Sequence, residues 1–191
     1  MLKRISFFLS TAIIFFIISG VSLAATIQLP QTGQTKCYNK SGTEIPCTGT
    51  GQDGEIQAGI GWPSPRFADN GNGTVTDNLT GLMWVKSPDS TTRRWSKALD
   101  YCNNLNFAGH TDWRLPNVNE LESLVNADVP DTATWLNTQG FTNVQSFYYW
   151  SSSTSAYNTN RAWDVNMGSG SMYYFIKGYY DDYVWPVRAG Q

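Results

Sequence analysis

Apolar residues recur at helical spacing in two stretches in the middle of the chain. From Arg94 to about Asn106 they lie three or four positions apart, as on one face of a helix. The second stretch begins at Asn117, which can cap a helix, and Glu120 stands three residues later, as in a capping box. The pattern therefore predicts two amphipathic helices, with apolar faces made of Trp95, Ala98, Leu99, Cys102 and Leu105 and of Val118, Leu121, Leu124 and Val125.

Short runs of β-prone residues flank these helices. Before them, Asn70-Gly71-Asn72-Gly73 favours a tight hairpin because Asn and Gly tolerate positive φ, and residues 81–85 form a further candidate strand. After about Tyr148 the helical spacing gives way to runs rich in Tyr, Trp and Val. These predict strands near residues 149–153, 161–167, 171–177 and 183–188, with a turn at Gly168-Ser169-Gly170. The order predicts an α+β fold, with two helices packed on an antiparallel sheet with hairpins.

The N-terminus has the pattern of a secretory signal peptide. Lys3 and Arg4 precede an apolar run from Phe7 to Ile18, and small residues lie just before Ala25. The apolar run is shorter than the roughly 20 residues that a membrane-spanning helix needs. We therefore expect residues 1–24 to be removed. The exported chain would be periplasmic, bound to the cell surface or secreted, with no membrane insertion after cleavage.

Residues 25–65 are rich in Thr, Gly, Gln and Pro and contain few large apolar residues, which predicts an N-terminal arm before a globular domain over residues 66–191. Cys37 and Cys47 flank a Ser-Gly turn that would bring their sulfurs together. We expect a disulfide there, worth about 3 kcal/mol. Cys102 lies on an apolar helical face, which predicts a buried free thiol.

Charge and composition narrow the choice of partners. The sequence has 13 Lys and Arg and 15 Asp and Glu, and loss of Lys3 and Arg4 makes the mature chain more acidic. We therefore expect no binding to nucleic acid. One His and three Cys disfavour a zinc site. Residues 69–73 have calcium-loop spacing, but they lack the closing Glu, so we interpret them as a turn and expect no cofactor, with calcium left open.

Several motifs stand in a characteristic order. They are Trp62-Pro63, the run from Asp69 to Trp84, Asp112-Trp113-Arg114-Leu115-Pro116-Asn117, Tyr149-Trp150-Ser151-Ser152 and Trp185-Pro186-Val187-Arg188. Together they resemble the Lcl C-terminal domain family, named for a bacterial collagen-like surface adhesin, over nearly the whole mature chain. The resemblance implies a C-type-lectin-like fold and an adhesin role. The named member binds sulfated polysaccharides, but the basic residues that such a ligand requires are not evident here.

The apolar motif residues are interpreted as core. We expect Trp113 and Leu115 to be buried, and Trp150, Trp185 and Val187 to face inward from strands. Arg114 would then be available to hydrogen-bond neighbouring carbonyls or a carboxylate across the fold.

The region from Tyr148 to Tyr183 contains more Tyr, Asn and Asp than a core requires. Strand alternation cannot bury both members of Tyr173-Tyr174 or of Tyr179-Tyr180. Tyr supplies flat apolar area with a polar tip, and Asn and Asp add adaptable hydrogen bonds. The alternative is that these are ordinary solvated strand residues. The candidate ligand-binding residues are Tyr157, Asn158, Asn160, Trp163, Tyr173, Tyr179, Tyr180 and Asp181.

Three classes of function remain open. We expect a binding module for carbohydrate or protein, which predicts that Tyr173, Tyr179 and Trp163 or their neighbours share one exposed face. The second class is a structural or assembly component of the envelope, with a homo-oligomer left open. The third is a hydrolase with a carboxylate pair, although adjacent Asp residues more often mark a solvated turn. Its candidates are Glu120, Glu122, Asp131, Asp181 and Asp182.

Overall fold

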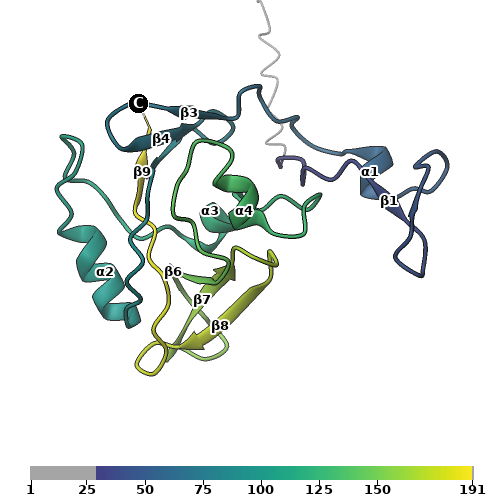
Figure 1. Cartoon of the computed structure of the whole chain (residues 1–191). Helices are drawn as coiled ribbons and strands as arrows, with labels where there is room; N and C mark the ends of the chain where they lie inside the picture. The colour runs from purple at the N-terminus through teal and green to yellow at the C-terminus, as the bar shows by residue number, and fades with distance from the viewer. Residues whose placement is uncertain (1–28, 191) are drawn as a thin grey trace, which may run out of the picture.

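The computed structural model describes residues 29–190, so the predicted signal peptide lies outside the described residues. Helices and strands are mixed along the chain (Figure 1). Within residues 29–190, no helix has the length and hydropathy needed to cross a membrane. The elements are β1 (Cys37–Tyr38), β2 (Glu44–Ile45), α1 (Asp53–Ile56), β3 (Phe67–Asp69), β4 (Thr74–Asp77), β5 (Leu82–Val85), α2 (Trp95–Asn103), α3 (Val118–Glu122), α4 (Thr132–Leu136), β6 (Tyr148–Thr154), β7 (Arg161–Asn166), β8 (Met172–Ile176) and β9 (Val187–Ala189).

The strands of the globular domain form two antiparallel sheets, one in the order β3-β4-β5-β9 and one in the order β6-β7-β8. The hairpin and the meander are confirmed, but the expectation of one sheet is wrong. The predicted strand over residues 183–188 is also wrong in extent: β9 begins at Val187 and pairs with β5. Pro186 interrupts the run because it has no backbone N–H to donate to a ladder.

The helices differ from the prediction in number. The two predicted helices are present as α2 and α3, although α2 ends at Asn103. The capping box at α3 is confirmed, because the Asn117 side chain accepts from the N–H of Glu120 and the Glu120 carboxylate accepts from the N–H of Asn117. The count of two is wrong, since the described residues also contain the short helices α1 and α4. Helix α3 is equally short but is marked by its capping box, whereas α1 and α4 have four or five residues and no capping box.

Two clusters of buried side chains hold the domain together. The first joins both sheets to α3 and α4, and the second lies between α2 and the β6-β7-β8 sheet. Tyr149 and Val165 belong to the first cluster, whereas Trp150 and Ala162 belong to the second, so the two faces of this sheet serve different cores. The predicted burial is confirmed for Trp113, Leu115, Trp150, Trp185, Val187 and the free thiol of Cys102.

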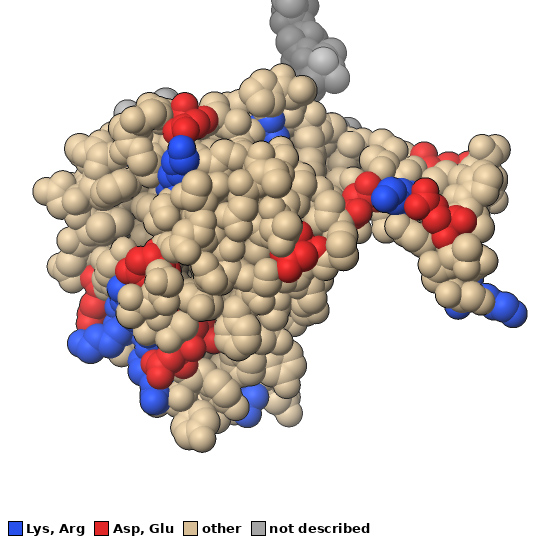
Figure 2. Space-filling model, viewed as in Figure 1, with Lys and Arg blue, Asp and Glu red and all other residues tan. Residues whose placement is uncertain are grey.

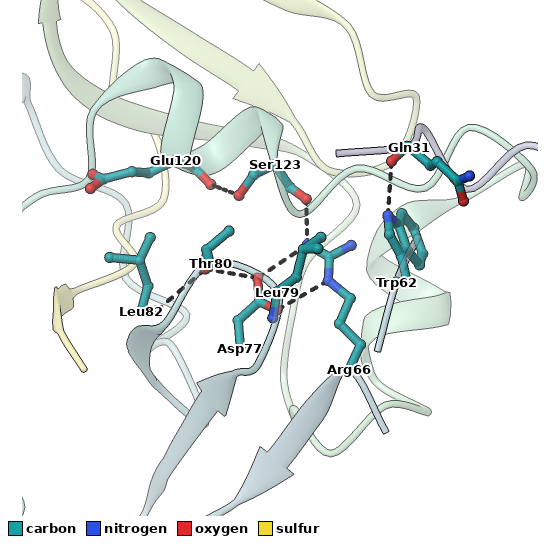
Figure 3. A network of polar contacts seen from close by, with 9 residues as sticks. All are labelled: Gln31, Trp62, Arg66, Asp77, Leu79, Thr80, Leu82, Glu120 and Ser123. Carbon is teal, nitrogen blue, oxygen red and sulfur yellow. Dashed lines mark hydrogen bonds and ion pairs between the residues drawn. The ribbon is translucent and has the colours of Figure 1, made fainter. Parts of the chain in front are cut away.

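A buried ion pair ties the first sheet to α3. Arg66 donates from Nε and Nη2 to the Asp77 carboxylate at 3.2 and 3.1 Å, and Nη2 also donates to the carbonyl of Ser123 at 2.5 Å (Figure 3). The Asp77 carboxylate accepts two further hydrogen bonds, from the N–H of Leu79 and the hydroxyl of Thr80. The charge on Asp77 is therefore fully balanced inside the domain.

The N-terminal arm carries the Cys37–Cys47 disulfide, which confirms that prediction. Its hairpin and α1 project from the globular domain (Figure 1). The base of the arm is attached by Thr35, whose N–H and hydroxyl both donate to Asp128, and by Thr32, whose carbonyl accepts from the N–H of Ala127. The arm is therefore fastened to the domain at its base, while its disulfide closes the far end.

Candidate ligand-binding surface

Aromatic rings form a continuous array along one side of the β6-β7-β8 sheet and the segment that follows β8. Phe175 lies at its centre, with ring centroids 4.9 Å from Tyr148, 5.1 Å from Tyr173 and 4.5 Å from Tyr180. One further ring extends the group at each end, Phe147 beside Tyr148 and Tyr179 beside Tyr180. We call this group the aromatic array; its members are Phe147, Tyr148, Tyr173, Phe175, Tyr179 and Tyr180.

Much of the aromatic array faces solvent. Tyr179 is 70% exposed, and Tyr173 is half exposed. Beside them lies an open hollow of about 210 Å³, which is smaller than the roughly 300–1,000 Å³ of most small-molecule pockets. The hollow therefore suits one small group of a larger ligand. It is lined by Arg161, Tyr173, Phe175, Ile176 and Tyr180.

The hollow lies at the edge of a sheet. In the order β6-β7-β8, strand β8 pairs with β7 on one side and with no other strand among residues 29–190 on the other. Backbone N–H and C=O groups along such an edge are available to a ligand. The surface therefore combines exposed rings with backbone hydrogen-bonding groups.

Of the residues predicted to bind a ligand, three belong to the aromatic array: Tyr173, Tyr179 and Tyr180. Asp181 follows them in the chain, and its Oδ1 accepts a hydrogen bond from Arg94 Nε at 2.9 Å. The structure therefore brings these four predicted residues together in one region.

Trp163 lies on the opposite face of the sheet from Tyr173. The register pairs Trp163 with Tyr174 and Asp164 with Tyr173, and successive strand residues point to opposite faces. The rings of Trp163 and Tyr174 are in edge contact, with centroids 5.0 Å apart. Trp163 itself therefore lies on the other face, although its neighbour Tyr174 stacks on Tyr173, with ring centroids 5.6 Å apart, and so connects Trp163 to the aromatic array.

The other predicted residues lie in the loop between β6 and β7. Tyr157 is 91% exposed and, within the described residues, makes no aromatic contact. The carbonyl of Asn158 accepts from the N–H of Arg161, and that of Asn160 accepts from the N–H of Lys177. The two Asn backbones thus shape this loop, and the structure divides the predicted residues between two places.

Arg161 was not among the predicted residues, although it lines the hollow. Its guanidinium carbon lies 5.3 Å from the ring centroid of Tyr174. Its Nε is buried and donates to no acceptor among residues 29–190. Nothing in the sequence distinguishes Arg161 from other residues at a strand end. Phe175 could have been found, because it is two positions from Tyr173 on the same strand face.

Three of the carboxylates considered for a hydrolase, Glu120, Asp131 and Asp181, lie on separate parts of the chain. Glu120 accepts two hydrogen bonds from Arg114, at 2.6 and 2.7 Å, which confirms the expected carboxylate partner of Arg114. Burial would raise the pKa of Glu120, but these bonds and a backbone N–H outweigh burial and lower the pKa. Asp131 caps α4, and Asp181 is held by its ion pair. These carboxylates are already engaged in structural contacts.

Two other carboxylates lie buried close to the aromatic array. Asp164 is fully buried, Asp182 is 2% exposed, and neither Asp164 oxygen nor Asp182 Oδ2 has a hydrogen-bond partner within residues 29–190. Burial, with the neighbouring charge of Asp182, raises the pKa of Asp164 to about 8. Burial, with the charge of Asp181, raises the pKa of Asp182 to about 7. The expected solvated turn is thus correct for exposed Asp181 and wrong for Asp182.

The loop with calcium-like spacing is occupied by its own contacts. The Asp69 carboxylate accepts from the N–H of Gly71 and from Lys86 Nζ, and the Asn72 side chain accepts from the N–H and hydroxyl of Thr74. These contacts support the interpretation of this loop as a hairpin turn.

Charged side chains are mixed in sign on the face shown in Figure 2, where basic groups lie beside acidic ones. Several form ion pairs, including Arg93 with Asp89 and Lys97 with Asp100. On this face the described residues offer no continuous basic surface of the kind that a nucleic acid needs.

A protein-family model matches most of the globular domain. Residues 73–188, more than half of the chain, match the model of a family described as the Lcl C-terminal domain. The matched region runs from the turn before β4 into β9 and includes the aromatic array. No curated protein matches the chain.

Proposed function

We propose that this chain, which belongs to the Lcl C-terminal domain family, is a carbohydrate-binding module whose site is the aromatic array. The observation that carries the proposal is a continuous row of exposed and half-exposed rings beside a small hollow at a sheet edge. Rings left at the surface are costly unless they serve a contact, and large flat rings with polar tips suit the mixed apolar and hydroxyl faces of a sugar.

The geometry supports a division of roles in such a site. The apolar face of a sugar would stack on Tyr173 and Tyr180, with the hollow between them receiving one ring. Arg161 lines the hollow and would donate to sugar oxygens from its Nη groups, because its Nε is buried. The phenol groups of Tyr173 and Tyr180 add further donors and acceptors at the rim.

The proposal extends to the fold and the location of the protein. Helices packed against antiparallel sheets, together with family membership, support a C-type-lectin-like fold. The Cys37–Cys47 disulfide is typical of an oxidising compartment, which supports export directed by residues 1–24. The mature chain would then act in the periplasm, at the cell surface or outside the cell.

A glycan-array screen of the mature chain, with neutral and acidic sugars, tests the proposal. The test variant carries Tyr173→Ala with Tyr180→Ala, and the matched control carries Tyr157→Ala, which removes an exposed Tyr outside the array. We expect binding by the wild type and the control, and about fivefold to about 150-fold weaker binding by the double variant, because each lost ring removes about 0.5–1.5 kcal/mol.

Two results would contradict the proposal. Absence of binding to every glycan would favour a protein ligand or an assembly role instead. Equal binding by all three proteins would place the sugar site away from the aromatic array.

A further inference from the structure

Among residues 29–190, both oxygens of Asp164 and Oδ2 of Asp182 are buried without a hydrogen-bond partner of ordinary geometry, although a buried carboxylate normally ionises only when it is paired or hydrogen-bonded. Neither residue contributes to the sugar contacts proposed above. Burying these oxygens without hydrogen bonds costs free energy, and the positions of the two residues suggest what that cost serves.

Both carboxylates lie on the side of the sheet that carries the aromatic array. Asp164 sits in β7 between its register partners Trp150 and Tyr173. Tyr183 lies beside β6. Its N–H donates to the carbonyl of Tyr148, and its carbonyl accepts from the N–H of Trp150. The ring of Tyr183 contacts Tyr149 on the opposite side of the sheet, so alternation places Asp182 on the Trp150 side.

Asp182 belongs to the segment over residues 177–183, which carries part of the proposed binding surface. Tyr179, Tyr180 and Asp181 all lie on it. The segment is attached by two backbone hydrogen bonds between Asp182 and Arg93, of 2.9 and 3.2 Å, and by Tyr183 beside β6. Any force that separates Asp182 from Asp164 therefore acts on the position of the binding residues.

The charged and titratable groups around the pair are committed to other contacts. Arg93 holds Asp89 through two hydrogen bonds and lies over the ring of Tyr101. None of these groups, within residues 29–190, forms an ion pair or hydrogen bond with Asp164 or with Asp182 Oδ2. The groups on the elements packed against the pair are Asp89, Arg93, Arg94, Tyr101 and Cys102 around α2, Tyr148, Arg161 and Tyr173 on the sheet, and Lys177, Tyr179, Tyr180 and Asp181 on the segment.

We propose that Asp164 and Asp182 form a proton-operated latch for the segment over residues 177–183. While the two carboxyl groups are protonated they are neutral, and the segment rests on the sheet with the aromatic array assembled. When both lose their protons, two unpaired negative charges repel each other in a buried site and draw in water. The segment then separates from the sheet, and Tyr179 and Tyr180 leave the array.

The direction of the pH effect follows from the raised pKa values of the two groups. Burial and the adjacent carboxylates raise the pKa of Asp164 to about 8 and that of Asp182 to about 7, above their usual value of 3.8. Because the folded state holds these protons more tightly than the unfolded state, their stabilising contribution is complete at low pH. It is lost as the pH rises through about 7 and about 8.

A bound cation is the alternative means of neutralising the pair. Within the described part of the chain, however, no group of three or more His, Cys, Asp or Glu residues could hold a metal ion. Two carboxylates alone supply fewer oxygen ligands than calcium takes. A proton therefore fits this site better than a metal.

Hydrogen exchange of the mature chain, corrected for the intrinsic pH dependence of exchange, tests the latch without any ligand. In the wild type we expect protection of the Asp182, Tyr183 and Arg93 amides to fall at least about tenfold between about pH 6 and about pH 9. Asp164→Asn and Asp182→Asn each remove one of the two ionising groups together with the repulsion between them, so the fall in protection should be clearly smaller than in the wild type. Asp100→Asn, which removes an exposed carboxylate from α2, should behave as the wild type.

Three outcomes would overturn the latch. They are pH-independent protection in the wild type, the wild-type pH dependence in both Asn variants, and protection at high pH that calcium restores and a chelator removes. Either Asn variant alone suffices if the other fails to fold. The latch rests on the proposed function only where it predicts weaker glycan binding at high pH, so an absence of glycan binding would leave the exchange result standing.

Discussion

Asp77 and Asp164 are both fully buried in strands, but their surroundings are opposite. The Asp77 carboxylate accepts hydrogen bonds from Arg66, from the N–H of Leu79 and from the hydroxyl of Thr80. Within residues 29–190 the Asp164 carboxylate accepts no hydrogen bond of ordinary geometry, and only a weak contact from the backbone N–H of Phe175 opposes the rise of its pKa. The first sheet therefore uses a buried charge to fasten its hairpin to α3, whereas the second sheet leaves a carboxylate unbalanced beside the surface where exposed aromatic residues gather.

The aromatic residues of the two regions differ in their exposure to solvent. Trp84 and Trp185 are fully buried, with ring centroids 5.5 Å apart, and the indole N–H of Trp185 donates to the carbonyl of Val85. Tyr173 and Tyr179 instead remain exposed. This contrast indicates that the β3-β4-β5-β9 region is a scaffold. It also indicates that the aromatic array beside the β6-β7-β8 sheet can rearrange at a moderate cost in free energy.

The largest expected effect comes from breaking the balanced charge. Arg66→Met leaves Asp77 buried without its cation, and we expect a loss of about 3–5 kcal/mol in the free energy of unfolding. Denaturant unfolding followed by tryptophan fluorescence measures it. Lys86→Met, which breaks the exposed pair with Asp69, is the control and should cost about 0–1 kcal/mol. Equal losses in the two variants would contradict the scaffold role of Arg66.

The disulfide should affect the arm and leave the two sheets intact. Replacing both Cys37 and Cys47 by Ser is expected to destabilise the arm by about 3 kcal/mol, because the closed loop no longer restricts the unfolded chain. Limited proteolysis should then cleave within residues 29–65, while the thermal transition of the domain stays in place. A large fall in the midpoint temperature of that transition would show that the arm is part of the scaffold.

The unbalanced carboxylate should make stability depend on pH. We expect the free energy of unfolding of the wild type to fall by about 2 kcal/mol more than that of Asp164→Asn between about pH 5 and about pH 9. The raised pKa of Asp164, about 8, sets this direction, because ionisation in the folded state is unfavourable. Urea unfolding at several pH values measures the difference. Parallel curves for the two proteins would contradict it.

The smallest effect is expected at the exposed loop between β6 and β7. Tyr157→Ala should change the free energy of unfolding by no more than about 0.5 kcal/mol, since Tyr157 is 91% exposed. Thermal melting checks this value. A loss above about 1 kcal/mol would mean that the loop takes part in the scaffold.

Features that depend on neighbours in the chain were predictable. The capping box at Asn117 and Glu120, the hairpin turn around Gly71 and the Cys37–Cys47 disulfide each join residues close in sequence. Their geometry follows from a few backbone angles, so residue type and spacing suffice. The burial of Trp113 and Trp185 was predictable for a different reason, since large apolar side chains leave water wherever the fold permits.

Features that depend on register were not predictable. Whether Trp163 shares a face with Tyr173 depends on which residues of β7 and β8 are partners, and a shift of one residue would reverse the answer. The same reason applies to Arg161, whose place beside the hollow follows from the pairing of β7 with β8.

Local sequence was thus enough to specify the helices α2 and α3, the hairpins, the disulfide and a surplus of surface aromatic residues. The assignment of β9 to the first sheet and the burial of Asp182 beside Asp164 depended instead on long-range packing. Segments far apart in sequence meet only when the whole core is assembled, because burial is shared among many weak contacts. Adjacent residues as similar as Asp181 and Asp182 can therefore end in opposite environments.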